Sequence, residues 1–149
     1  AQDEPGILST HMHADGRHHE LLYAGNPLNA LESSHTIKMK GNEVFRKAVG
    51  ALESLVSELV EQDGLDEERI DWLIPHQANL RIIQATAKKL KLPMEKVILT
   101  VKEQGNTSAA SVALALDYGI RSGKIKRGEL LLLEAFGAGL TWGSVLLQY

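Results

Sequence analysis

Three short segments of the sequence place residues that can donate hydrogen bonds next to small, flexible residues. Their central residues are His76, Asn106 and Ala138, the last of which stands between two glycines. Each segment is predicted to be a loop at the end of a β-strand. Ligands of open α/β sheets collect at the carboxyl ends of the strands. These three loops are therefore the first candidates for a functional site.

His76 follows a predicted strand that ends at Pro75, and a helix is predicted to begin just after it. The partial positive charge of a helix N-terminus disfavours a protonated imidazole. A neutral His76 could donate one N–H to a substrate oxygen. The placement alone is equally compatible with a histidine that caps the helix, so both interpretations stay open.

The other two loops have plainer alternatives. Gly105 frees the backbone, and Asn106 or Thr107 could cap the following helix, which is a common pattern without catalytic meaning. Ala138 and its flanking glycines would let a backbone N–H approach a developing oxyanion, or they form only a tight hairpin turn. This loop joins two strands, so it is not a dinucleotide-binding fingerprint, which opens a helix.

The remaining polar clusters give weaker indications of a functional site. Four histidines near the N-terminus could suggest a metal site, but the Asp15-Gly16 pair interrupts their spacing and no metal is expected; they are His11, His13, His18 and His19. Basic side chains on predicted helices, Arg46, Lys47 and Arg81, are either solvated or positioned to meet a phosphate or an acidic partner. No nucleophile elbow, phosphate-binding loop or zinc-protease motif occurs.

The composition excludes several classes of protein. The 149 residues are 44% hydrophobic and 23% charged, as in an ordinary soluble domain, and the net charge of -3 argues against nucleic acid as a partner. Unbroken apolar runs such as 130–133 are far shorter than the roughly 20 residues of a membrane span. There is no cysteine, hence no disulfide or thiolate metal site, and no secretory signal, so a cytoplasmic protein is expected.

The hydrophobic periodicity predicts alternating strands and helices. A long helix is predicted between a cap at Asn42 and a stop at Gly64, with an apolar stripe from Val44 to Val60. Strands are predicted at 7–13, 35–40, 70–75, 97–101, 129–136 and 140–149, further helices at 77–91 and 107–122, and a long surface connection at 14–34. This order implies an α/β fold with a parallel sheet, in which only the last two strands, joined by a short turn, are antiparallel.

Five segments resemble, in order and spacing, the beta-ketoacyl-acyl-carrier-protein synthase III family. They are residues 75–82, 105–111, 134–139, 6–11 and 40–45. The resemblance covers essentially the whole chain. It implies a thiolase-like α/β fold, made of two similar halves that each have a five-stranded mixed sheet with helices on its faces. Residues 1–34 would then be the last strand of the N-terminal half and a connecting loop, and residues 35–149 the C-terminal thiolase-like domain.

The resemblance also implies a chemistry. The family uses Cys, His and Asn: the Cys takes an acyl group from acetyl-CoA or another acyl-CoA, malonyl-acyl-carrier protein loses carbon dioxide, and the enolate attacks the acyl thioester. His76 and Asn106 match the His and Asn, which donate to the malonyl thioester oxygen. Chain-elongating relatives have a second His where Asn106 stands, so an initiating enzyme primed by acyl-CoA is implied.

The nucleophile has no counterpart, since the chain lacks Cys. The expected function is the C-terminal catalytic half of such a synthase, active only together with its N-terminal half. The alternatives are a catalytically inactive fragment and a module that binds the carrier protein. No cofactor is implied, because acetyl-CoA is a substrate, and the intact family is dimeric, so a homodimer is expected of the intact enzyme.

The resemblance assigns further residues. Those matching the carrier-protein-binding stretch are Gln77, Ala78, Asn79, Leu80 and Arg81, with Arg46 in a similar role. Those matching the pantetheine tunnel and active centre are Gly41, Phe45, Ala78, Asn79 and Phe136. Ala138 stands where the family usually has Gly, and its N–H would keep the oxyanion role.

Overall fold

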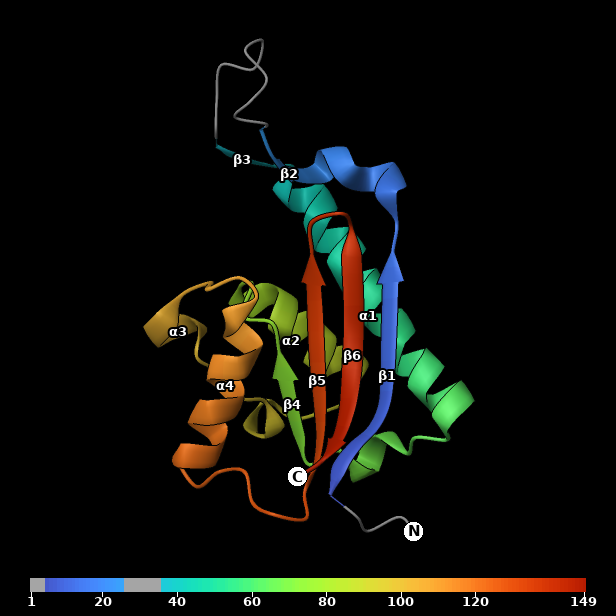
Figure 1. The fold of residues 1–149 in the computed structure, drawn as a ribbon, viewed down its shortest axis with the longest axis vertical. Helices are drawn as coiled ribbons and strands as arrows, with labels where there is room; N and C mark the ends of the chain where they lie inside the picture. The colour runs from blue at the N-terminus through green and yellow to red at the C-terminus, as the bar shows by residue number, and fades with distance from the viewer. Residues whose placement is uncertain (1–4, 26–35) are drawn as a thin grey trace.

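A single sheet forms the centre of the computed structural model, which describes residues 5–25 and 36–149 (Figure 1). Its strands lie in the order β1 (Gly6–Ala14), β6 (Thr141–Gln148), β5 (Leu130–Gly137) and β4 (Trp72–Pro75). β4 and β5 are parallel, whereas β6 is antiparallel to both of its neighbours. The predicted antiparallel pairing of the last two strands is confirmed, but the prediction that only these two are antiparallel is wrong, because β1 also pairs antiparallel with β6.

The predicted strand at 97–101 is wrong as a strand. It is reduced to one parallel bridge between Val97 and Leu73, supported by the Ile98 N–H, which donates to the Leu73 carbonyl at 3.0 Å. The short helix α3 (Val101–Gln104) begins where the strand was expected to end, so the backbone turns away from the sheet. The expected fifth strand of the sheet is thus represented by a single pair of bridged residues.

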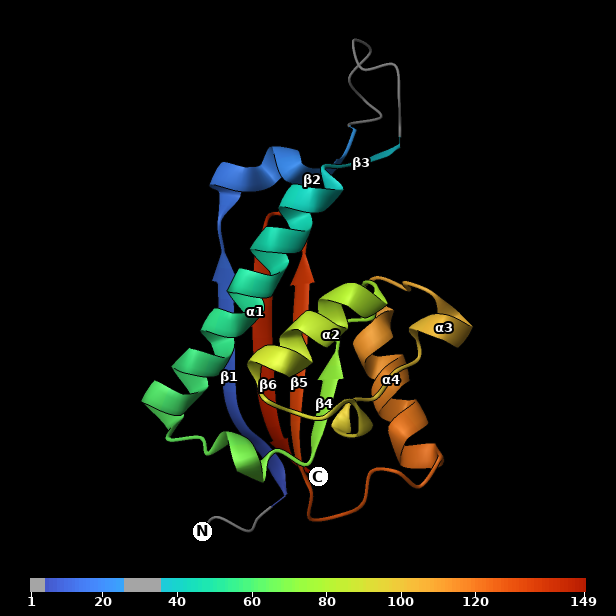
Figure 2. The same ribbon diagram turned by 180° about the vertical axis from the view of Figure 1, so that it is seen from behind.

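Helices cover both faces of the sheet. Apolar residues of α1 (Gly41–Asp63) and α2 (Leu80–Lys89) pack with Leu73 and Leu132 on one face, and Figure 2 shows both helices in front of the sheet. The helix α4 (Ala110–Arg121) packs with Ile74 and Leu131 on the opposite face. Because successive strand residues point to opposite faces, each strand supplies both cores.

The long helix α1 follows its predicted stripe closely. Its buried residues are Val44, Ala48, Leu52, Leu55, Val56 and Leu59, and Gly64 ends it in the left-handed conformation with φ 67°. Two details of the prediction are wrong. The N-cap is Lys40, so Asn42 lies inside the first turn, and Val60 is 39% exposed because the stripe has rotated away from the core at that turn.

β1 belongs to the same sheet as the rest of the chain. It pairs with β6 from Gly6 opposite Gln148 to Ala14 opposite Thr141, with an irregularity between Ile7 and Ser9. The boundary expected between residues 34 and 35 therefore does not divide the sheet, since β1 is its edge strand.

The connection predicted at 14–34 contains more structure than expected. A 3-10 helix (Gly16–Leu21) leads into β2 (Leu22–Ala24), which pairs antiparallel with β3 (Ile37–Met39). The rest of that predicted connection, from residue 26, lies outside the described residues.

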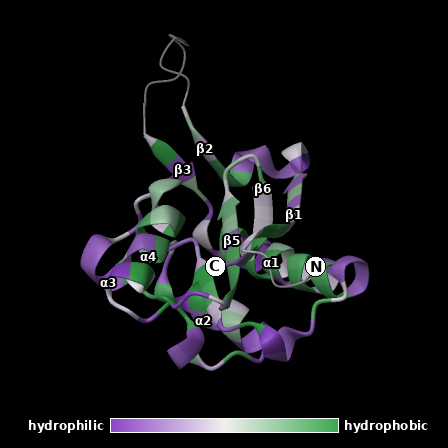
Figure 3. Cartoon of the chain, turned by 60° about the horizontal axis from the view of Figure 1, so that its bottom comes forward, coloured by the Kyte–Doolittle hydropathy of each residue, from purple (hydrophilic) through white to green (hydrophobic). Residues whose placement is uncertain are grey.

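Hydropathy follows this layering. Figure 3 shows β5 mostly in the hydrophobic colour and α3 in the hydrophilic colour. Within the described ranges, none of the helices combines the length and apolar character that crossing a bilayer requires.

Candidate active site

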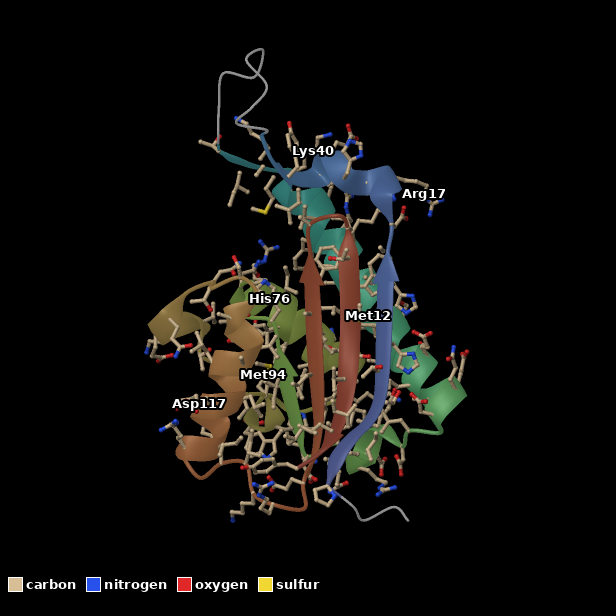
Figure 4. The ribbon with its side chains drawn as sticks, viewed as in Figure 1. Met12, Arg17, Lys40, His76, Met94 and Asp117 are labelled. Atoms are coloured by element: carbon tan, nitrogen blue, oxygen red, sulfur yellow. The ribbon has the colours of Figure 1, made fainter. Side chains whose placement is uncertain are left out.

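His76 lies at the carboxyl end of β4, where Figure 4 shows it next to the upper end of α4. Its backbone N–H donates to the Glu134 carbonyl on β5 at 2.7 Å. Its ring Nδ1 is 2.5 Å from the Ser111 hydroxyl, in the first turn of α4. The ring is half-buried, and this burial lowers the pKa of His76, so the imidazole is neutral near pH 7.

The predicted reason for a neutral His76 has to be corrected. The following helix, α2, begins only at Leu80, and its N-cap is Asn79, whose Oδ1 accepts from the Ile82 N–H at 3.0 Å. His76 is therefore not at the start of α2. Its ring contacts the N-terminal turn of α4 instead, where the partial positive charge of that helix disfavours the imidazolium in the same direction as burial does.

Gln77, the residue after His76, is completely buried and fixes the loop that carries His76. Its amide nitrogen donates to the carbonyls of Pro75 at 2.8 Å and Ile98 at 3.1 Å, and its Oε1 accepts from the N–H groups of Thr100 at 2.9 Å and Val101 at 3.0 Å. Both donors and both acceptor positions of the amide are thus occupied within the chain. The side-chain amide of Gln77 is therefore fully hydrogen-bonded within the chain, and the match of Gln77 to a carrier-protein-binding stretch stays a prediction.

Asn106 lies exposed in the loop between α3 and α4. Its Oδ1 accepts from the Ser108 N–H at 2.9 Å, which leaves the amide N–H₂ group without a hydrogen bond to the part of the chain that the structure describes. The alternative in which Asn106 or Thr107 caps the following helix does not hold, because α4 has Ala109 as its N-cap without a side-chain hydrogen bond. The contact between Ser111 and His76 brings this loop to the end of β4.

Ala138 lies exposed in the turn between β5 and β6, and its carbonyl accepts from Thr141 Oγ1 at 3.0 Å. The left-handed backbone conformation falls on the next residue, Gly139, with φ 137°. Ala138 itself is outside that region, so the turn accommodates its methyl group.

Three of the residues matched to the substrate tunnel meet in one place. Phe45, Ala78 and Phe136 pack, with Trp142, against a core cluster of α1 and α2. The members of that cluster are Ala48, Leu52, Leu55 and Ile82. Gly41 is the first residue of α1 and is exposed, and the side chain of Asn79 is engaged in capping α2.

Two basic side chains flank this apolar surface. The guanidinium of Arg81 lies 5.3 Å from the centroid of the Phe45 ring, which joins α2 to α1 by a cation–π contact. Arg46, the next residue on α1, lines a pocket of about 230 Å³ together with Phe136 and Trp142. Leu80, beside Arg81, is 45% exposed. These side chains form an accessible rim around the loops.

Two residues of the site were missed by sequence reasoning. Ser111 was included in a loop segment but given no role; a Ser in the first turn of the helix after the Asn106 loop was the available signal. Glu134 is 1% exposed with neither carboxylate oxygen hydrogen-bonded to the described residues, and burial raises its pKa to about 8. A single acidic residue in a continuous apolar strand was the signal for it.

No group of three or more His, Asp or Glu side chains suited to a metal ion is found in residues 5–25 and 36–149.

The structure has a mixed sheet between helical layers and a neutral histidine at a strand end, as the resemblance to a thiolase-like α/β half implied. Residues 60–149 match the family described as 3-oxoacyl-[acyl-carrier-protein (ACP)] synthase III C terminal. The chain belongs to this family.

Similar curated proteins and solved structures support the same family. The beta-ketoacyl-[acyl-carrier-protein] synthase III of Methylococcus capsulatus is 57% identical over 149 residues, covering 98% of this chain and 46% of that protein. That of Xanthomonas euvesicatoria is 58% identical and is covered to 47%. The crystal structure of 3-oxoacyl-[acyl-carrier-protein] synthase III from Aquifex aeolicus superimposes with a TM-score of 0.90 at 47% identity, over 100% of this chain and 46% of that one. The chain thus spans about half the length of the curated relatives it matches.

Proposed function

We propose that this chain is the C-terminal half of a beta-ketoacyl-acyl-carrier-protein synthase III, and that it supplies the hydrogen-bond donors for decarboxylation while the other half supplies the nucleophile. The observation that carries the proposal is His76, neutral and anchored at a strand end beside the Asn106 loop. The chain has no Cys, so it is not expected to hold an acyl group by itself.

In the proposed reaction, a Cys thiolate of the N-terminal half attacks an acyl-CoA carbonyl, and the coenzyme A thiolate leaves. Malonyl-acyl-carrier protein then binds, and the bond between its α-carbon and its carboxylate breaks to release carbon dioxide. The electron pair forms an enolate, whose carbon attacks the acyl thioester and expels the Cys thiolate. The product is a 3-oxoacyl-carrier protein, the start of fatty acid synthesis.

His76 and Asn106 act at the decarboxylation step. Negative charge grows on the malonyl thioester oxygen as carbon dioxide leaves. Two fixed neutral donors stabilise this charge more than they stabilise the substrate, and this difference lowers the barrier. Ala138, on the neighbouring hairpin turn, is proposed to offer its backbone N–H to a different oxyanion, that of the tetrahedral intermediate formed when the enolate attacks the acyl thioester.

The rim of the site is proposed to bind the acidic carrier protein. Arg81 and Arg46 carry the positive charge, and Leu80 offers an exposed apolar contact beside them. The cation–π contact with Phe45 fixes the Arg81 guanidinium, so less side-chain entropy is lost on binding. Phe45, Ala78 and Phe136 would line the pantetheine path leading inward from this rim.

An uncovered apolar surface supports the presence of a second half. Met12 on β1 is 87% exposed, and Leu114 and Tyr118 on α4 are 38% and 41% exposed. Met12 alternates with His11 and His13, which contact α1, so it lies on the face away from α1. A half that carries the Cys and packs on this face would cover these side chains.

The test joins this chain to the Cys-bearing half, either its own or that of the Methylococcus capsulatus relative; we call the product the complete synthase. With acetyl-CoA and malonyl-acyl-carrier protein it should form the 3-oxoacyl product, whereas mass spectrometry should find no acyl adduct on this chain alone. Carrier-protein binding without turnover by the complete synthase would favour a binding module, and neither activity would favour an inactive fragment. An acyl adduct on the isolated chain would contradict the proposed division of roles.

A further inference from the structure

The ring of His76 is held by one side chain, the hydroxyl of Ser111. Ser111 is 1% exposed and lies in the first turn of α4. Its Oγ is 2.5 Å from His76 Nδ1 and also accepts from the Gln77 backbone N–H at 3.1 Å. The two contacts involve consecutive residues of one loop, and the loop itself is fixed by the four hydrogen bonds of the Gln77 amide.

The geometry determines where the hydroxyl proton lies. A serine hydroxyl has one proton and two lone pairs. The Gln77 N–H can only donate, so it occupies a lone pair of Ser111 Oγ. In the described part of the chain, His76 Nδ1 is the only acceptor within hydrogen-bonding distance of this hydroxyl. A buried hydroxyl proton without an acceptor is costly, so the Ser111 O–H donates to Nδ1.

A neutral imidazole that accepts a hydrogen bond at Nδ1 carries its own proton at Nε2. His76 Nε2 makes no hydrogen bond to residues 5–25 or 36–149 and is not among their buried unpartnered atoms, so it is accessible to a ligand. We propose that Ser111 is a positioning residue that holds neutral His76 in the Nε2–H tautomer, so that the ring offers a proton donor, not a lone pair, to the substrate oxygen.

This inference rests on the proposed function for its consequence in catalysis, but its structural content is independent of it. With the proton on Nδ1, the accessible nitrogen would present a lone pair to an oxygen that is becoming negative, and would repel it. Ser111 lies five positions after Asn106 in the chain, so the same contact that sets the tautomer also ties the ring to the helix that follows the Asn106 loop.

The direct test is the protonation state of His76 in the unaltered chain. Two-bond ¹H–¹⁵N correlation spectra of protein labelled at histidine report which ring nitrogen carries the proton, and His76→Gln assigns the signals. The expected result is a protonated Nε2 and an unprotonated Nδ1 at neutral pH. A His76 protonated at Nδ1 overturns the inference, and this readout needs neither catalysis nor a folded Ser111 variant.

The second test is kinetic and uses the complete synthase. Ser111→Ala should lower kcat for malonyl decarboxylation by about 10–100-fold, as is typical for loss of a partner that orients a functional imidazole. KM for malonyl-acyl-carrier protein and the rate of Cys acylation should stay within about 2-fold, because neither depends on a donor at Nε2.

The matched control is Ser122→Ala at the other end of α4, where the hydroxyl donates to the Gly119 carbonyl; its rates should equal those of the unaltered enzyme. A Ser111→Ala enzyme that decarboxylates at the unaltered rate overturns the inference. If the unaltered complete synthase forms no product, the proposed function fails, and the spectrum alone then decides the role of Ser111.

Discussion

His76 and His11 are the same residue type in two regions of one sheet, and their surroundings shift their pKa values in opposite directions. His76, at the end of β4, is half-buried beside a hydroxyl, and burial lowers its pKa. His11, on β1, lies 2.7 Å from Asp63 and 3.4 Å from Glu58 of α1, and the hydrogen bond that its ring donates to the Asp63 carboxylate raises its pKa.

The difference teaches what each histidine does. A neutral ring with an accessible nitrogen can serve as a hydrogen-bond donor to a reacting oxygen. A ring whose raised pKa favours the protonated form between two carboxylates instead joins the edge strand to a helix. The surroundings separate the candidate catalytic histidine from the structural one, although both were candidates by residue type alone.

The largest expected effect comes from removing the neutral donors. In the complete synthase, His76→Ala or Asn106→Ala should each lower malonyl decarboxylation by about 10²–10³-fold, the usual loss for one oxyanion donor, while Cys acylation by acetyl-CoA remains measurable. The matched control is His11→Ala, which should leave both half-reactions near their original rates. An equal loss of both half-reactions in His76→Ala would contradict the division of roles.

Glu134 extends the comparison to a carboxyl group, because burial disfavours its charged form too. Its pKa is raised to about 8, against about 4.5 in the unfolded chain, so the folded state keeps a proton that the unfolded state loses. The free energy of unfolding should therefore fall as pH rises from about 4.5 to 8, by up to about 1.4 kcal/mol per pH unit.

Glu134→Gln should abolish this part of the pH dependence. Urea unfolding at pH 5, 6.5 and 8 should show the variant gaining stability over the unaltered chain as pH rises, because Gln carries no titrating proton. A difference between the two proteins that is constant across this range would show that Glu134 is ionised in the folded state.

Arg81 tests whether the rim acts apart from the chemistry. Arg81→Glu in the complete synthase should raise KM for malonyl-acyl-carrier protein by about 5–10-fold, since repulsion replaces attraction to an acidic partner, with little change in acylation by acetyl-CoA. Arg69→Glu, an exposed charge reversal at the opposite end of β4, is the matched control. An unchanged KM in Arg81→Glu would assign Arg81 to the solvated surface.

The smallest effect is expected at the charged histidine. The raised pKa of His11 gives a stability contribution that is complete below about pH 6.5 and is lost as pH rises through the folded-state pKa. Asp63→Asn should therefore destabilise the chain more at pH 6 than at pH 9, by less than about 1 kcal/mol for a partly exposed pair at the surface. Thermal unfolding of both proteins at the two pH values measures this; equal losses would mean that His11 is not charged at pH 6.

Most of the fold could be predicted from the sequence because the apolar residues of the core recur at regular helix and strand spacings. The stripe of α1, the apolar run of β5 and the β5–β6 turn were all recognisable from spacing alone. The strand at 97–101 was not, because its residues have strand-like composition and only the tertiary placement of α3 ends the pairing after Val97. Nor could the pairing of β1 with β6 be read, since it joins residues more than 120 positions apart.

The sequence predicted which residues belong to the candidate site, but it did not predict which residues they contact. His76 and Asn106 were recognisable by type and by family spacing, whereas the burial of Gln77 and the Ser111–His76 hydrogen bond depend on where α3 and α4 pack. The neutral state of His76 was expected for the wrong helix, because the start of α2 was placed three residues too early.

The most direct test of the central claim is a pH titration of the histidine rings in one protein sample, followed by ¹H–¹⁵N spectra with His11 and His76 assigned by substitution. We predict that His76 titrates below, and His11 above, the ordinary histidine midpoint of about 6.5. At pH 6.5 the first ring would then be mostly neutral and the second mostly protonated. Coincident midpoints, or the reverse order, would contradict the claim that the two surroundings shift the pKa values of these rings in opposite directions.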